Sequence, residues 1–179
     1  MMYQEVLEFW FVDSKPEQWW QKDTGFDREI ERRFLSLHQQ AKAGELCDWR
    51  STAEGSLAEI IVLDQFSRNL FRDQPESFAS DSLALALAQF AINKGFDRAL
   101  EPTERSFLYM PFMHSESKLI HEQALVLFED LGNANNLDFE RQHKAIIDRF
   151  GRYPHRNAIL GRESSAEELA FLAQPNSSF

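Results

Sequence analysis

Along almost the entire chain, hydrophobic residues recur every three or four positions, the spacing of amphipathic α-helices. Within residues 26–44, Phe26, Ile30, Phe34 and Leu37 would share one helix face. Helical spacing or a helix-start signal occurs in the segments 3–12, 15–20, 26–44, 51–71, 81–95, 102–111, 118–132, 137–151 and 164–172. No segment has a convincing strand pattern, so the sequence predicts an all-α protein of about eight to ten helices.

Residues with known preferences for helix ends indicate the boundaries. Ser51 and Ser164 stand three positions before Glu54 and Glu167, the spacing of a capping box at a helix start. Pro111 should interrupt its helix, because proline lacks a backbone N–H and its ring clashes with the preceding turn. Antiparallel helix pairs of about 30–40 residues would fit a tetratricopeptide-like solenoid or bundle.

Size and composition fit one folded domain. The chain has 179 residues, of which 43% are hydrophobic, so it can bury enough apolar surface to offset the loss of chain entropy. We expect a single domain over residues 1–179, with a frayed tail at residues 173–179.

Several classes of protein lack their usual sequence marks. Cys47 is the single cysteine, which excludes an intramolecular disulfide; we expect a partly buried thiol in a reducing compartment. Residues 1–13 have no basic leader, and no window approaches about 18 uninterrupted apolar residues. Phosphate-binding glycine loops, dinucleotide-binding motifs, nucleophile elbows and zinc-protease motifs do not occur. We therefore expect a cytoplasmic protein with no cofactor, metal or membrane partner.

Positive charge is concentrated in one segment of an acidic chain. The formal net charge is −10, yet residues 141–162 contain six Lys or Arg residues and one acid. Arg152 and Arg156 flank His155 there, and Pro154 should stiffen the connector. Because guanidinium groups bind carboxylate or phosphate bidentately, the segment could capture an anion. Alternatively, these arginines pair with the chain's own carboxylates and fasten the C-terminal helices.

Polar residues also fall on predicted apolar helix faces. Asp64 and Arg68 are four positions apart and can pair, although burying charge is costly unless it is matched. The pair could lie at a solvated helix end or lock two helices together, or Arg68 and Asn69 could point into a cleft. His143 lies on an apolar stripe, where a core histidine is more common than a ligand.

Three longer segments carry a family resemblance: LDQFSRNLF (63–71), YMPFMHSES (109–117) and RFGRYPHRNAILGRESSAEELAFL (149–172). Together with VLEFWF (6–11), they resemble the bacterial domain-of-unknown-function 924 family over essentially the whole chain. Ser165 stands where members commonly carry Thr. The resemblance implies an all-helical, tetratricopeptide-like fold but no established activity and no agreed catalytic residues. The family's recurring polar motifs fall on Asp64, Gln65, Arg68, Asn69, His114, Glu116, Arg149, Arg152, His155, Arg156 and Asn157.

We predict a non-enzymatic binding protein whose Arg- and His-lined cleft captures an anionic ligand, RNA or another phosphate-bearing molecule. We expect Tyr109 and Tyr153 to be exposed aromatic residues on which bases can stack. The expected ligand-binding residues are Asp64, Arg68, Asn69, Tyr109, His114, Glu116, Arg149, Arg152, His155, Arg156 and Asn157. Two alternatives stay open: a peptide- or protein-binding adaptor, and an acid–base hydrolase that uses His114, Glu116 and His155.

Overall fold

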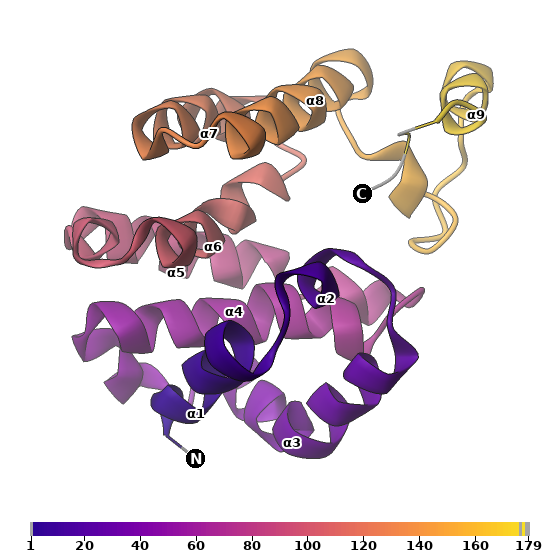
Figure 1. The fold of residues 1–179 in the computed structure, drawn as a ribbon. Helices are drawn as coiled ribbons and strands as arrows, with labels where there is room; N and C mark the ends of the chain where they lie inside the picture. The colour runs from indigo at the N-terminus through magenta and orange to yellow at the C-terminus, as the bar shows by residue number, and fades with distance from the viewer. Residues whose placement is uncertain (1, 176, 178–179) are drawn as a thin grey trace. The chain divides into compact units, whose positions relative to one another are not determined.

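The computed structural model describes residues 2–175 and 177 and confirms an all-α fold (Figure 1). These residues form nine α-helices and no strand: α1 (Tyr3–Glu8), α2 (Pro16–Trp20), α3 (Thr24–Lys42), α4 (Ala53–Leu70), α5 (Asp81–Asn93), α6 (Pro102–Met113), α7 (Lys118–Leu131), α8 (Ala134–Phe150) and α9 (Ala166–Leu172). Short helical turns lie between them: η1 (Phe9–Asp13), η2 (Cys47–Ser51), η3 (Pro75–Ser77), η4 (Phe96–Ala99) and η5 (Pro154–Arg156). In the described part of the chain, no helix has the length and apolar character needed to cross a membrane. The expected frayed tail lies partly outside the described residues.

Two helices begin one residue later than their capping signals predict. Thr52, not Ser51, caps α4, because its hydroxyl accepts the N–H of Gly55 at 3.0 Å. At α9 the capping box is formed by Ser165 and Glu168. In both places the next hydroxyl residue along the chain is the N-cap, since a Ser or Thr side chain at either position can accept a hydrogen bond from a backbone N–H of the first turn.

Two other helices are longer than predicted. Helix α6 continues through Pro111 to Met113, so the expected break is wrong. Proline so near a helix end removes one backbone hydrogen bond, but only the last residues of the helix follow it, so the helix can continue to its end. Helix α8 begins at Ala134 because the Asn133 side chain accepts two backbone N–H groups, at 3.0 and 3.2 Å.

The chain divides into two compact units. The first unit comprises Met1–Arg72 and Glu76–Pro111, and the second comprises Asp73–Pro75 and Phe112–Phe179. In the first unit, α4 lies at the centre and packs against α1, α3, α5 and η2. Residues 55–67 of α4 are all buried, as expected for a helix enclosed on every side.

Aromatic side chains fill the core of the first unit. Phe34 and Phe66 have ring centroids 4.9 Å apart, and Trp10 lies 5.6 Å from Phe66 and 5.6 Å from Phe107. All four rings are at most 1% exposed. Rings at these distances and tilts add favourable quadrupole contacts to their large buried apolar area.

The second unit is built on a helical hairpin. Helices α7 and α8 run side by side, joined by a short connection (Figure 1). Gly151 ends α8 at φ 71°, a left-handed conformation that favours glycine, and the chain then turns into η5 and α9. Ile146, Ile147 and Tyr153 form one buried apolar cluster, against which Phe150 and Phe171 pack. Phe112, Met113, Ala124 and Phe128 of this unit are buried as well.

Candidate functional site

Arg68 pairs with two carboxylates in the first unit. Its Nη1 and Nη2 donate to the two oxygens of Asp81 at 3.0 and 3.1 Å, and Nη1 lies 3.3 Å from Asp64 Oδ1. Asp64 is fully buried and also accepts a hydrogen bond from Gln65 at 2.6 Å. The predicted Asp64–Arg68 pair is confirmed, and its carboxylate lies in the interior.

Asn69 holds α4 to α3. Its Nδ2 donates to Asp27 Oδ1 at 2.8 Å. The same carboxylate accepts two bonds from Arg72, at 2.8 and 2.7 Å. Three donors on one carboxylate make a cross-link between helices, which is a structural role.

Tyr109 is buried in the first unit. Its hydroxyl donates to Asp97 Oδ2 at 2.7 Å and accepts from Arg105 Nε at 2.7 Å. Burial, with the hydrogen bond to Asp97, raises the pKa of Tyr109 to about 12. The expectation of an exposed ring for base stacking is wrong here, because the ring is 0% exposed.

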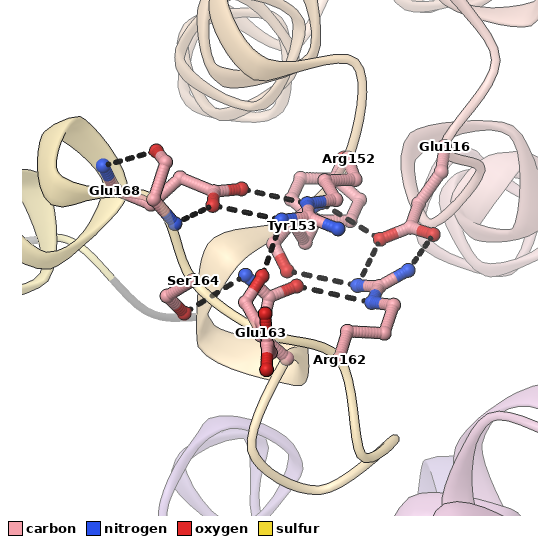
Figure 2. A network of polar contacts seen from close by, with 9 residues as sticks. Glu116, Arg152, Tyr153, Arg162, Glu163, Ser164 and Glu168 are labelled. Atoms are coloured by element: carbon pink, nitrogen blue, oxygen red, sulfur yellow. Dashed lines mark hydrogen bonds and ion pairs between the residues drawn. The ribbon is translucent and has the colours of Figure 1, made fainter.

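In the second unit, Glu116 accepts hydrogen bonds from two parts of the 149–162 segment (Figure 2). Arg162 donates to its two oxygens at 2.7 and 2.9 Å, and the backbone N–H of Tyr153 donates at 2.7 Å. Burial alone would raise the pKa of Glu116, but these donors outweigh it and the pKa is lowered. Glu116 is therefore held as a carboxylate that fixes the connector after α8.

Arg152 makes a second bidentate pair. Its Nε and Nη2 donate to Glu168 at 2.7 and 2.8 Å, and Nη2 also donates to the carbonyl oxygen of Glu163 at 2.8 Å (Figure 2). Glu168 also accepts the N–H of Ser165. The hydrogen bond from Arg152 is the main reason that the pKa of Glu168 falls to about 2. This pair fastens the start of α9.

Asn157 connects Arg162 to Ser164, near the start of α9. Its Oδ1 accepts from Arg162 Nε at 3.0 Å, and its Nδ2 donates to Ser164 Oγ at 3.0 Å. Arg149 lies apart from this network: its Nε donates to Glu167 at 2.8 Å, in a pair whose side chains are 47% and 63% exposed.

Arg156 and two histidines surround the ring of Tyr153. The Arg156 guanidinium lies 4.6 Å from the ring centroid and donates to the carbonyl oxygen of His114 at 3.0 Å. The His155 ring lies 5.6 Å from the same centroid, and the His143 ring 5.7 Å. Tyr153 is 0% exposed, so it too is unavailable for stacking on bases, contrary to expectation.

A fully buried histidine–carboxyl pair was not foreseen from the sequence. His121 Nε2 lies 2.8 Å from the carbonyl oxygen of Ser115, which only accepts, so Nε2 carries a proton. His121 Nδ1 lies 2.7 Å from Glu140 Oε1, so one further proton is shared between them. Burial raises the pKa of Glu140. His143 is buried with Nδ1 2.7 Å from the carbonyl oxygen of Phe139, as predicted for a core histidine.

The predicted site residues are divided between the units. Asp64, Arg68, Asn69 and Tyr109 belong to the first unit and the other seven to the second. Each arginine among them contacts acceptors of its own unit, and the partners Asp81, Glu167 and Glu168 were not identified beforehand. Among the described residues, no group of three or more His, Cys, Asp or Glu side chains is placed to hold a metal ion.

A groove in the first unit was missed altogether. It has a volume of about 770 Å³ and lies between η2 and α5, lined by Cys47, Asp48, Arg50, Ser51, Ala86, Leu87 and Phe90. Cys47 is exposed, contrary to the expected partly buried thiol, because η2 is a surface turn. Gly55 lets η2 approach α4, since a Cβ there would lie 2.1 Å from the carbonyl oxygen of Trp49.

Arg50 forms part of one side of this groove, and a buried carboxylate holds its guanidinium in place. Its Nε and Nη2 donate to the two oxygens of Glu59, each at 2.7 Å, and the Glu59 side chain is 1% exposed. The hydrogen bond that Arg50 donates to Glu59 is the main reason that the pKa of Arg50 is raised. The guanidinium is therefore fixed in place and charge-compensated.

Comparison with known proteins places the chain among proteins of unknown function. No functionally curated protein matches the sequence. A solved structure of a protein of unknown function from Agrobacterium tumefaciens is 39% identical, with a TM-score of 0.91 over 95% of this chain and 96% of that one. A family model described as "bacterial protein of unknown function (DUF924)" matches residues 6–176. The chain therefore belongs to the DUF924 family.

Proposed function

We propose that this protein is a non-catalytic adaptor that binds a peptide segment of a partner protein in the groove between η2 and α5. The observation that carries the proposal is the groove itself, which combines an apolar wall on α5 with charged and polar groups on η2. Peptide sites generally pair an apolar surface with a few fixed polar groups. A tetratricopeptide-like arrangement of helix pairs would suit such a role, and the packing of α7 against α8 supports this part of the proposal.

The pairing of the arginines favours an adaptor over the predicted anion cleft. Arg68, Arg152 and Arg162 each donate to both oxygens of a carboxylate in their own unit. A phosphate would have to displace these carboxylates. The carboxylates have the advantage, because groups of the same chain pair without the entropy cost of association that an external phosphate must overcome. The role that these contacts support is fastening helices and connectors.

The single thiol gives a direct test. Peptides selected from a phage-displayed library of short sequences should slow the reaction of Cys47 with Ellman's reagent, because the thiol lines the groove. Phe90→Ala should weaken their binding about tenfold or more, since Phe90 supplies much of the apolar wall. Leu169→Ala is the control, because Leu169 is exposed on α9, in the second unit. Selected peptides that neither protect Cys47 nor respond to Phe90→Ala would refute the groove.

Anion binding remains a second candidate because of Arg149. Its pair with Glu167 is exposed on both sides, and such pairs are weak enough for an external phosphate to compete. A short single-stranded RNA titrated at two salt concentrations would test this: binding should fall steeply with salt and with Arg149→Ala. RNA binding of that kind, without Cys47 protection by peptides, would replace the adaptor proposal.

The hydrolase alternative has less support. Glu116 accepts three hydrogen bonds and its pKa is lowered, which suits a structural carboxylate better than a general acid. His114 contributes its carbonyl oxygen to Arg156. Unchanged turnover of generic phosphoesters and acyl esters in His114→Ala and His155→Ala would exclude these residues.

A further inference from the structure

The groove between η2 and α5 contains one carboxylate that is not matched by a cation. Arg50 is compensated by Glu59, whose two oxygens it contacts. Asp48 is exposed, and its described side-chain contact is the Cys47 thiol, with Sγ 3.8 Å from Oδ1. Among the described residues, no Lys or Arg forms an ion pair with Asp48. The polar side of the groove is therefore negative at Asp48.

The opposite side is apolar and comes from one face of α5. Ala86, Leu87 and Phe90 are spaced one and three positions apart, and Phe90 is 39% exposed. Lys94 already places its ammonium 5.6 Å from the Phe90 ring centroid. A cation of a bound partner is thus repelled at the Lys94 end and attracted at Asp48.

We propose, building on the adaptor function, that the groove selects a peptide segment in which an apolar side chain is adjacent to a lysine or arginine. The apolar side chain packs on Leu87 and Phe90, and the cation pairs with Asp48. Arg50, held by Glu59, keeps donor capacity on Nη1 for a peptide carbonyl oxygen. The acidic net charge of the chain, −10, favours the approach of such a basic partner.

A charge-reversal experiment tests this selection. The probes are fluorescein-labelled Lys-Leu-Lys-Leu, Gln-Leu-Gln-Leu and Glu-Leu-Glu-Leu, titrated by fluorescence polarisation against the full chain. The wild type should bind the Lys peptide about two- to fivefold more tightly than the Gln peptide, the range for one exposed ion pair. Asp48→Lys should abolish or reverse this preference, whereas Glu31→Lys, an exposed change of equal charge on α3, should keep it.

The outcomes separate this inference from the adaptor proposal. A preference that survives Asp48→Lys, or that is lost equally in Glu31→Lys, would show a net-charge effect and overturn the selection. If all three peptides bind equally and Phe90→Ala still weakens them, the adaptor stands and the selection for a cation falls. If no peptide responds to Phe90→Ala, both proposals fall.

Discussion

The two units are stabilised by different means. The first unit encloses α4 in aromatic and aliphatic side chains, and ring contacts connect Phe34 to Phe66, Phe66 to Trp10 and Trp10 to Phe107. The second also buries apolar side chains, among them Phe128, Ile147 and Tyr153, and bidentate Arg–Glu pairs hold its C-terminal segment. Apolar burial depends little on pH and salt, whereas ion pairs depend on both. The arginine-rich segment thus adds ion pairs to the apolar packing of the second unit.

The largest expected effect is a cavity in the first unit. Phe66→Ala should lower the free energy of unfolding by about 3–5 kcal/mol, because it removes a fully buried ring that contacts several others. Urea denaturation followed by tryptophan fluorescence would report on this unit, since all four Trp residues lie in it. Phe66→Leu should cost markedly less. A loss below about 1 kcal/mol would contradict the enclosed core.

Removing the Glu116 carboxylate from the second unit should lower the free energy of unfolding by a smaller amount. Glu116→Ala leaves Arg162 and the Tyr153 N–H without their acceptor, and we expect a loss of about 2 kcal/mol. Circular dichroism during urea denaturation would measure it. Glu116→Gln keeps the shape and one acceptor oxygen, so it should recover part of the loss. If Glu116→Ala were neutral, the pairing would not fasten the connector.

A third comparison uses one buried histidine from each unit. Burial lowers the pKa of His38 to about 4 and that of His143 to about 3, from an ordinary value of 6.5. Below pH 6.5 the unfolded chain binds the proton and the folded chain does not, so stability is full above pH 6.5 and falls with acidification. Each histidine should contribute a loss of about 2 kcal/mol between pH 6.5 and pH 5.

Substitution separates the two histidine contributions. His38→Gln and His143→Gln should each flatten the pH dependence of the urea midpoint in this range. The raised pKa of Glu140 acts in the opposite direction, since a carboxyl that keeps its proton on folding loses stability as pH rises. The contribution of Glu140 to the pH dependence is present in both variants and in the wild type, so it cancels when their slopes are compared. An unchanged slope in either variant would mean that its imidazole is not held neutral.

Much of the fold could be predicted from sequence, but the partners of the charged residues could not. Helical spacing predicted the all-α fold and the core position of His143, and four-residue spacing predicted the Asp64–Arg68 pair. The other pairs join positions far apart, such as Arg162 with Glu116, which are 46 residues apart. In a chain with 29 acidic residues, spacing does not indicate which carboxylate a given arginine meets.

The groove escaped prediction for a related reason. Its wall on α5 looks like ordinary helix surface, and η2 carries no motif. An exposed aromatic at Phe90, in an otherwise Ala- and Leu-rich helix, was the available signal. Signals of that kind are weak, because single exposed apolar residues are common on protein surfaces.

The smallest expected effect distinguishes an exposed ion pair from a partly buried one within the second unit. Arg149→Ala removes a bond to Glu167 in which both side chains are largely exposed, so stability should change by no more than about 0.5 kcal/mol. Arg149 also covers part of the Phe150 ring at 4.7 Å, and Arg149→Lys keeps the charge while reducing that stacking. Urea denaturation would compare Arg149→Ala with Glu116→Ala. Equal losses of unfolding free energy in the two variants would contradict the distinction between a surface pair and the network around Glu116. If Arg149→Ala leaves the free energy of unfolding almost unchanged, the same variant can test RNA binding, because it removes a cation of the segment without disturbing the fold.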